Sequence, residues 1–327
     1  MPDPAVVDPA VPDPGVPRVV AVVVSYNRRD LLIEGLNAIY SQSRRPDAVI
    51  VVDNASTDGS AAAARSQFPE ARVVELAMNY GGAGGFAYGM ALALAQGAGL
   101  IWVMDDDTVP EPGALEAMLG ARASYQGTPP VLLASRVVWT DGRDHPMNSP
   151  RPKPLARQAE RTIAAAAGCT PIRSASFVSV LVEAHECRRR GLPRADFFLW
   201  NDDFEFTTRL LRGQVGLLCP ASVVVHKTRA FGSTDVDPGE RFFFEVRNKI
   251  WTFRSGSLAP VEKVLYGVST LRRWVLTYTK SADRGALRSA FGRGIAAGWR
   301  SSPRPNEEVL PPLLASVDEA DQVGQQG

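Results

Sequence analysis

The sequence has few cysteines and no long apolar run, and both features exclude classes of protein. Its 327 residues include only three cysteines, Cys169, Cys187 and Cys219, which are widely spaced, so no zinc knuckle or redox pair is visible. Reduced thiols fit a cytoplasmic protein. No apolar segment approaches the roughly 20 residues that a membrane-spanning helix requires. The net charge of +1 provides no overall field for nucleic acid, and we expect no nucleic acid as a partner.

Composition divides the chain into four segments. Residues 1–17 are acidic and repeatedly broken by proline. They lack the basic start and apolar core of a signal peptide, and we expect a disordered tail. Residues 18–255 are expected to form the main folded domain, because a stretch this long can bury a proper core. Residues 256–304 are expected to form a basic helical region, and residues 305–327 a second disordered tail.

Short apolar runs alternate with helix-like stretches in the first half of the chain. The first run covers residues 18–26, and later runs end at or just before Asp53, Asn79 and Asp105. Such runs, separated by helical stretches, indicate βαβ units and a parallel sheet. We therefore expect an α/β fold of the Rossmann-like type, in which helices flank a mostly parallel sheet.

The second half of the chain is less regular. Residues 140–172 are rich in proline, arginine and alanine and suggest a long loop or lid with a short helix inside it. Residues 215–227 suggest a pair of strands that ends at His226, and a helical pattern runs from about Pro238 to Arg300.

Polar residues follow the carboxyl ends of successive predicted strands. They are Ser25, Asn27, Asp53, Asn79 and Asp105. Ligands of open α/β sheets bind along that edge, so these positions are candidates for a binding site.

Three adjacent carboxylates, Asp105, Asp106 and Asp107, directly follow a buried apolar run. Adjacent carboxylates repel one another, and a divalent cation turns that repulsion into binding. Mg²⁺ and Mn²⁺ favour carboxylate oxygens and often take phosphate as a further ligand. The alternative is a solvated acidic turn or a helix cap, because residues 108–112 suggest the start of a helix.

The glycine-rich segment NYGGAGGF, residues 79–86, opens a predicted helix. Glycine lets a ligand approach the backbone, and a helix N-terminus attracts phosphate. A dinucleotide-binding fingerprint would instead follow the first strand, where this chain has Ser25, Tyr26 and Asn27. This position argues against a dinucleotide-binding oxidoreductase.

Two residues at strand ends suit a nucleotide. Asp53 could accept a hydrogen bond from a nucleobase N–H, although a simple turn aspartate is the alternative. Arg28 could meet a diphosphate as a planar cation.

Asp202 and Asp203 lie among aromatic and apolar residues. Burial beside another acid raises a carboxylate pKa and suits the group to act as a base. The alternative is a helix start at which acidic residues stabilise the dipole. His226 is a candidate third metal ligand, with a structural histidine as the alternative. His145 has no comparable context, and His185 is expected on a helix surface.

The ordered motifs VVVSYNR, VVDNASTDGS, NYGGAGGF, DDD, NDDFE and VVH resemble the inverting glycosyltransferases of family 2, which have the GT-A fold. The resemblance covers roughly residues 18–255. The NYGGAGGF and DDD segments are most similar to the galactofuranosyltransferases that build the actinobacterial cell-wall galactan. The short chain resembles the initiating enzyme more than the polymerising one.

This resemblance implies a role for each candidate residue. It assigns Asp105 and Asp107 to the DxD site for Mn²⁺ or Mg²⁺ and the diphosphate, and His226 to the same metal. Asp203 would be the catalytic base and Asp202 its neighbour on the acceptor side. The positions implied to contact the nucleotide are Tyr26, Arg28, Asp53, Asn79, Asp105 and Asp106.

The resemblance also implies the substrates. The donor would be a UDP-sugar, UDP-galactofuranose, and the acceptor a polyprenyl-linked glycan that ends in rhamnose, in cell-wall galactan synthesis. One alternative is a family 2 rhamnosyl- or hexosyltransferase of another cell-surface glycan. Another is a non-catalytic nucleotide-binding partner of a membrane complex.

The region of residues 261–304 contains nine basic and two acidic residues. Apolar residues recur beside them at roughly helical spacing: Leu265, Val268, Leu271, Trp274, Val275 and Tyr278. A basic amphipathic helix suits an anionic membrane surface, so we expect peripheral binding to the inner face of the plasma membrane. The alternative is that this apolar stripe packs on the catalytic core.

Overall fold

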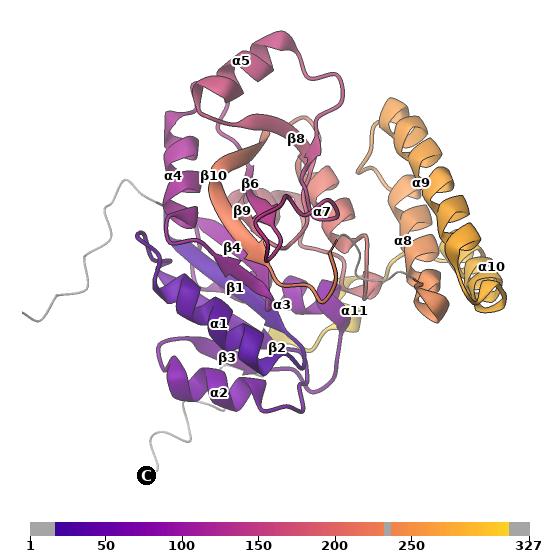
Figure 1. Cartoon of the computed structure of the whole chain (residues 1–327), viewed down its shortest axis with the longest axis horizontal. Coiled ribbons are helices and arrows are strands. Elements are labelled where there is room, and N and C mark those ends of the chain that lie inside the picture. Colours follow the sequence, from indigo (N-terminus) through magenta and orange to yellow (C-terminus); the bar gives the residue numbers. More distant parts are fainter. Residues whose placement is uncertain (1–16, 232–236, 314–327) are drawn as a thin grey trace, which may run out of the picture.

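The computed structural model describes residues 17–231 and 237–313, so the predicted tail of residues 1–17 lies almost wholly outside the described residues. A mixed sheet flanked by helices forms the body of the molecule, and helices α8 to α10 stand along one side of it (Figure 1). The strands are β1 (Val19–Ser25), β2 (Ala48–Asp53), β3 (Arg72–Glu75), β4 (Leu100–Asp105), β5 (Thr108–Pro110), β6 (Leu132–Val138), β7 (Arg151–Pro152), β8 (Thr170–Ser174), β9 (Val180–Glu183) and β10 (Gly216–His226).

The helices alternate with these strands and then dominate the C-terminal part. The α-helices are α1 (Arg29–Tyr40), α2 (Ser60–Gln67), α3 (Gly81–Ala95), α4 (Ala114–Ser124), α5 (Gln158–Ala166), α6 (Ala184–Arg190), α7 (Asp202–Leu210), α8 (Phe242–Arg254), α9 (Pro260–Lys280), α10 (Arg284–Arg300) and α11 (Asn306–Val309). Two 3₁₀ turns are η1 (Ala195–Phe197) and η2 (Gly239–Arg241).

The strand order is β3-β2-β1-β4-β9-β6-β10-β8-β7, with β5 paired to β10. Strands β3, β2, β1 and β4 are all parallel. Strand β9 is antiparallel to both β4 and β6, and β6 is parallel to β10. The carboxyl ends of β4 and β10 therefore lie at the same edge of the sheet. The predicted α/β fold is confirmed.

Strand β1 lies at the centre of the core, and all seven of its residues are buried. Alternate side chains of a strand point to opposite faces, and here Ala21 packs into one hydrophobic cluster while Val22 packs into the other. Helix α1 covers the first face with residues such as Leu36, and α3 covers the second with residues such as Met90. A run that is apolar on both faces is typical of a buried parallel strand.

Helix α3 packs unusually close to the sheet. A Cβ atom on Gly89 would lie 2.5 Å from Cγ1 of Val22 and 2.9 Å from Cγ2 of Val52. Because glycine has no Cβ, the helix approaches these strands closely. This contact fixes where the glycine-rich N-terminus of α3 meets the sheet edge.

Two predictions of local structure were wrong. Residues 108–112 do not begin a helix: Thr108 and Val109 are β-branched and form the short strand β5, and α4 begins only at Ala114. Residues 215–227 form one strand rather than two. A shift of register between Cys219 and Val223 interrupts the pairing of β10 with β6. Pro220 lies within this irregularity, where a strand tolerates a residue without a backbone N–H.

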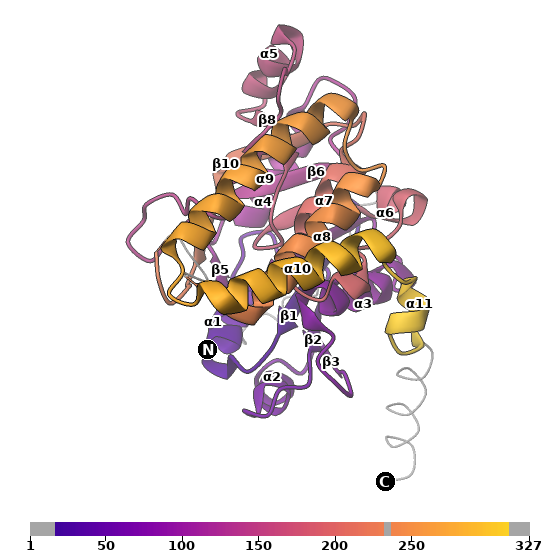
Figure 2. The ribbon, with the colours of Figure 1, turned by 90° about the vertical axis from the view of Figure 1, so that its right-hand side faces the viewer.

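The C-terminal helices form a small core of their own. Phe242, Val246 and Ile250 of α8 pack against Leu287 and Ala290 of α10. Helices α9 and α10 lie outward of α8 (Figure 2). Among the described residues, no helix is both long enough and apolar enough to cross a bilayer.

One face of α9 is apolar and exposed in the part of the chain that the structure describes. The exposed large apolar residues on this helix are Val261, Val264, Leu265, Val268, Leu271, Val275, Leu276 and Tyr278. Trp274 differs from the others in the predicted stripe, because its ring packs against Phe242 and Phe291. The stripe therefore does not cover the catalytic core.

The prediction that residues 305–327 form a disordered tail was wrong for residues 306–313. Helix α11 lies within it, and Leu310 and Leu313 pack against the second hydrophobic cluster. Asn306 also accepts a hydrogen bond from the backbone N–H of Ala195 at 2.9 Å. Residues 314–327 lie outside the described residues.

Candidate active site

A cavity of about 840 Å³ opens at the carboxyl edge of the sheet. Strand register creates this edge, because Ser25 pairs with Asp53 and Val24 pairs with Asp105. His226 joins them because β10 ends at the same edge as β4. The predicted site residues that line the cavity are Tyr26, Arg28, Asn79, Asp105, Asp106, Asp107, Asp202, Asp203 and His226. Three candidates from the sequence, Ser25, Asn27 and Asp53, are not part of this lining.

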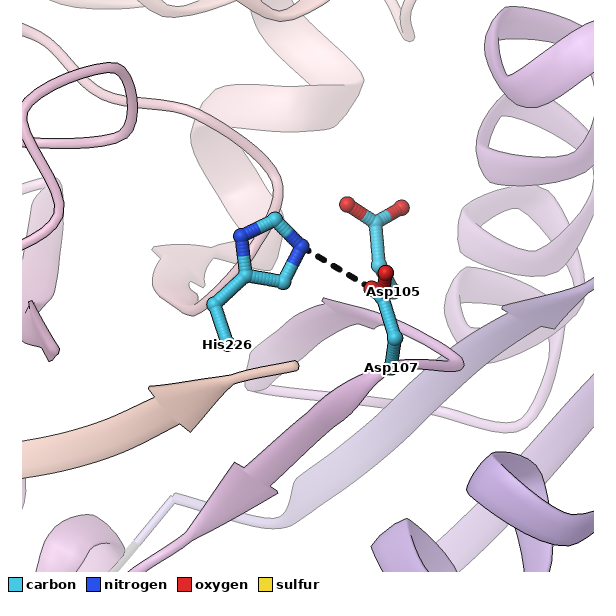
Figure 3. Close-up of side chains that lie close together, drawn as sticks. All are labelled: Asp105, Asp107 and His226. Atoms are coloured by element: carbon cyan, nitrogen blue, oxygen red, sulfur yellow. Dashed lines mark hydrogen bonds and ion pairs between the residues drawn. The ribbon is translucent and has the colours of Figure 1, made fainter. Parts of the chain in front are cut away.

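Asp105, Asp107 and His226 form a compact cluster, with ligand atoms that all lie within 4.8 Å of one another. Figure 3 shows the imidazole facing the Asp107 carboxylate, with the Asp105 carboxylate beside them. Strand β5 explains the proximity, because its pairing with β10 places Thr108 opposite His226. Two carboxylates and an imidazole are a donor set that can hold a divalent cation.

His226 is held from both sides. Its Nε2 lies 2.9 Å from Oδ1 of Asp107, and its Nδ1 lies 3.0 Å from Oδ1 of Asn148. Because the Asn148 amide oxygen is an acceptor, Nδ1 of His226 carries a hydrogen and donates it in this hydrogen bond, which leaves Nε2 as the ligand atom. Burial lowers the pKa of His226, but the hydrogen bond to Asp107 and the charge of Asp107 outweigh burial and raise the pKa above its ordinary value.

The three aspartates have different environments. Burial raises the pKa of Asp105 to about 6, and the nearby charge of Asp107 adds to the effect. Burial also raises the pKa of Asp106 to about 7, although the Arg28 cation opposes it. The pKa of Asp107 shifts in the opposite direction. Burial raises this pKa, but the hydrogen bond and charge of His226, followed by Arg28, outweigh burial and lower the pKa below its ordinary value.

Asp106 faces the first strand rather than the cluster. Its Oδ2 accepts a hydrogen bond from the backbone N–H of Tyr26 at 2.9 Å, and its Oδ1 lies 3.5 Å from Nη1 of Arg28. The same Arg28 nitrogen also pairs with Asp107. Asp106 therefore orders the Tyr26–Arg28 segment at the rim of the cavity.

Asp53 is 1% exposed and uses only one of its oxygens. Its Oδ1 accepts from the backbone N–H of Ser56 at 2.7 Å, whereas Oδ2 is buried without a hydrogen-bond partner among the described residues. A buried carboxylate oxygen without a partner is costly. Its neighbour Asn54 lines the cavity, which the sequence did not indicate.

The glycine-rich segment is held by two asparagines. Asn54 accepts from the N–H of Tyr80 at 2.9 Å and donates to the carbonyl oxygen of Gly81 at 2.9 Å. Asn79 accepts from the N–H of Gly81 at 2.7 Å. Gly81 has a φ of +71°, and a Cβ there would lie 2.0 Å from the carbonyl oxygen of Phe198. The segment therefore touches the turn that precedes Asp202.

Asp202 and Asp203 begin α7, as the sequence indicated. Burial raises the pKa of Asp202 well above its ordinary value, and the charge of Asp203 adds to this. Burial also raises the pKa of Asp203, but the N–H of Phe204, followed by the cations of Lys249 and Arg151, opposes it. Oδ1 of Asp203 accepts from that N–H at 2.6 Å. The pKa of Asp202 is therefore raised further than that of Asp203, which has two cations nearby.

Sequence reasoning missed several residues in this cavity. Lys249 is 3% exposed, lies 4.3 Å above the ring of Phe204, and has its pKa lowered to about 7 by burial. Arg151 approaches the same ring from the predicted lid. His145 is not part of the cavity lining, but it is fully buried beside it, with its ring centroid 5.3 Å from that of His226. None of these carries a local motif, whereas His185 is on the surface of α6, as predicted.

Comparison with protein families places the chain. The model of Glycosyl transferase family 2 matches residues 20–186. Galactofuranosyltransferase GlfT1 of Mycobacterium tuberculosis is 30% identical over 245 residues, which cover 69% of this chain and 79% of that protein. GlfT1 of Mycolicibacterium smegmatis is 47% identical over 92 residues, which cover 28% of this chain and 30% of that protein.

Solved structures with a similar fold include complexes with nucleotides. Residues 1–349 of S. aureus TarS in complex with UDP align with a TM-score of 0.60 and 15% identity, over 86% of this chain and 80% of that one. The mannosyltransferase PcManGT of Pyrobaculum calidifontis, in complex with GDP-Man and Mn²⁺, aligns with a TM-score of 0.51 and 20% identity, over 97% and 84%. The chain has the GT-A fold and belongs to glycosyltransferase family 2.

Proposed function

We propose that this glycosyltransferase is an inverting, metal-dependent galactofuranosyltransferase that uses UDP-galactofuranose as donor. The observation that carries the proposal is the joint presence, in one cavity, of the Asp105–Asp107–His226 cluster and of Asp203. The first can hold a cation at a diphosphate, and the second can accept a proton from an acceptor hydroxyl.

The cluster fits Mn²⁺ or Mg²⁺. Asp105 and Asp107 supply carboxylate oxygens, and His226 supplies Nε2, which Asn148 orients from the other side of the ring. Such a cation, when bound, neutralises the negative charge of a leaving diphosphate. Because His226 must lose a proton to become a ligand, metal affinity should increase with pH.

The nucleotide end of the cavity is lined by Tyr26, Arg28 and Asn79, and Asp53 is buried next to the lining residue Asn54. Arg28 has a guanidinium that can turn from Asp107 toward a diphosphate. Asp53 retains a buried oxygen as an acceptor for a nucleobase N–H. Asp106 holds Tyr26 and Arg28 in place through the contacts described above.

Asp203 is the proposed base. Its carboxylate takes the proton of the acceptor hydroxyl as that oxygen bonds to the anomeric carbon, and the bond from this carbon to the diphosphate oxygen breaks. Attack from the face opposite the leaving group inverts the configuration. The transition state is oxocarbenium-like, as in glycoside hydrolysis. The raised pKa of Asp202 favours its protonated form, which can donate a hydrogen bond on the acceptor side.

The name of the relatives that match this chain, galactofuranosyltransferase GlfT1, supports the galactofuranosyl donor. The bound nucleotides of the structural neighbours, UDP and GDP-Man, support a nucleotide-sugar donor in general. We propose a polyprenyl-linked, rhamnose-terminated glycan as acceptor, in cell-wall galactan synthesis. A rhamnosyl- or hexosyltransferase of another surface glycan is the second candidate, because one structural neighbour is a mannosyltransferase in complex with GDP-Man.

A lipid-linked acceptor requires the cavity to lie near a membrane. Helix α9 contributes Arg273 and Thr277 to the cavity lining, and its opposite face exposes residues such as Val268 and Leu271. Exposed basic residues, including Arg272 and Lys280, accompany them. We propose that this face binds the inner surface of the plasma membrane, where each basic residue contributes about 1 kcal/mol.

A donor panel tests the proposed function. The purified chain with Mn²⁺ and a synthetic rhamnose-terminated acceptor should transfer galactofuranose from its UDP derivative, and NMR should show inversion at the anomeric carbon. UDP-galactopyranose, UDP-N-acetylglucosamine and dTDP-rhamnose serve as comparison donors. Exclusive use of one of these would replace the galactofuranosyl assignment by the second candidate.

A further inference from the structure

The turn that leads into the acid pair has a strained backbone. Phe198, Trp200 and Asn201 have φ values of +61°, +63° and +64°. Asparagine tolerates this left-handed region, whereas bulky aromatic residues rarely adopt it. Such conformations persist where the surroundings hold them, and they cluster at functional sites.

Helix α8 provides the support for this turn. Asn248 is fully buried, and its Nδ2 donates to the carbonyl oxygens of Phe197, Leu199 and Trp200 at 2.9, 2.9 and 2.8 Å. The amide has only two hydrogens for these three acceptors, so they are shared. The side chain of Asn248 thus binds three carbonyl groups of the strained turn, all between residues 197 and 200.

Neighbouring residues of α8 complete the support. Arg247 donates from Nε to Oδ1 of Asn248 at 2.9 Å, so the amide nitrogen must point toward the turn. Arg247 also donates from Nη2 to the carbonyl oxygen of Phe197 at 3.1 Å. One turn earlier in the helix, Glu245 accepts from Nδ2 of Asn201 at 2.7 Å. Trp274 of α9 fixes Glu245 in turn, through a hydrogen bond of 3.1 Å.

The turn is also limited on its other side. The N–H of Ala83 in α3 donates to the carbonyl oxygen of Phe198 at 3.3 Å, and Gly81 leaves no room for movement in that direction. The turn therefore lies between the glycine-rich start of α3 and helix α8.

We propose that Asn248 is a positioning residue, which acts through the turn of residues 197–201 to place the Asp203 carboxylate for proton transfer. The inference rests on the proposed role of Asp203 as base. It gives the C-terminal helices, which lie beyond the family-matched residues 20–186, a part in turnover.

Asn248→Asp is the informative variant, because it preserves the shape of the side chain but removes the donated hydrogens. We expect kcat to fall about 10²-fold, the scale for a misplaced catalytic group, while KM for the donor and the affinity for UDP with Mn²⁺ stay within twofold. Thr252→Val is the matched control. Thr252 is equally buried on α8, and its hydroxyl donates to the carbonyl oxygen of Asn248 at 2.8 Å without touching the turn.

Hydrogen exchange provides a readout that does not depend on turnover. Peptides that cover residues 196–204 should exchange faster in Asn248→Asp than in Thr252→Val, with exchange in the central sheet unchanged. Loss of kcat together with this local change supports the proposal. Unchanged kcat, or an equal loss in both variants, overturns it. If the unaltered chain transfers no sugar, the proposed function fails, and exchange alone decides whether Asn248 holds the turn.

Discussion

The contact between Gly81 and Phe198 makes a quantitative prediction for Gly81→Ala. The new Cβ would lie 2.0 Å from the carbonyl oxygen of Phe198, whereas real Cβ contacts essentially never fall below 3.0 Å. The turn before Asp203 must therefore shift by about 1 Å, and a misplacement of that size can cost about 10²-fold in rate. We expect kcat for sugar transfer to fall by about this factor.

Gly97→Ala is the control variant, because it introduces left-handed backbone strain without displacing a neighbouring segment. Gly97 lies just beyond the other end of α3 with a φ of +76°, and a Cβ added there would meet no atom within 4 Å. Left-handed strain costs about 1–2 kcal/mol, and the stiffer unfolded chain offsets about 0.4–1 kcal/mol of it. We expect Gly97→Ala to lower Tm by about 2 °C and to leave kcat unchanged.

Steady-state kinetics and thermal melting of both variants show whether kcat depends on the position of the turn or only on the stability of the fold. Gly81→Ala should lose turnover and Gly97→Ala should keep it, with both folded at the assay temperature. If Gly81→Ala retains kcat within twofold of the unaltered chain, the turn does not transmit the displacement to Asp203, and the proposed coupling is wrong.

Three other predictions concern the base and the outer helix. Asp203→Asn should lower turnover by about 10²-fold or more and keep UDP binding. If Asp202→Asn is inactive while Asp203→Asn is active, Asp202 is the base and Asp203 its neighbour on the acceptor side. Because the pKa of Asp203 is raised and the base must be ionised, activity should fall as pH drops through that raised pKa. Lys249→Met removes a cation that lowers this pKa, so the acid limb of the pH profile should move to higher pH; a shift in the opposite direction contradicts the electrostatic account. The unaltered chain should float with anionic liposomes at low salt, whereas the double variant Val268→Glu, Leu271→Glu should not; equal flotation of both proteins would exclude α9 as the membrane-binding face.

The parts of the fold that the sequence predicted are those with a regular hydrophobic pattern. Strand β1 is apolar at every position, and its burial between two helical layers follows from that pattern alone. Strand β5 was missed because its three residues pair with β10, more than 100 positions later in the chain. Long-range pairing of this kind overrides local preference.

In the candidate site, the sequence predicted the residues at strand ends and missed those within helix α8. Asp105, Asp107 and His226 were found because each directly follows an apolar run, and parallel strands bring such ends together. Lys249 and Asn248 could not be found in this way, because they lie within an ordinary helical pattern. Their position in the cavity or beneath the turn depends on how α8 packs, which no local motif encodes.

Calorimetric titration of UDP into the purified chain, with and without Mn²⁺, tests the central claim most directly. The Asp105–Asp107–His226 cluster should make UDP binding metal-dependent, and Asp107→Ala should abolish the metal-dependent part. Asp106→Asn is the matched control, since Asp106 lies next in the chain but outside the cluster, and it should retain that dependence. Metal-dependent UDP binding of unchanged affinity in Asp107→Ala would contradict the account.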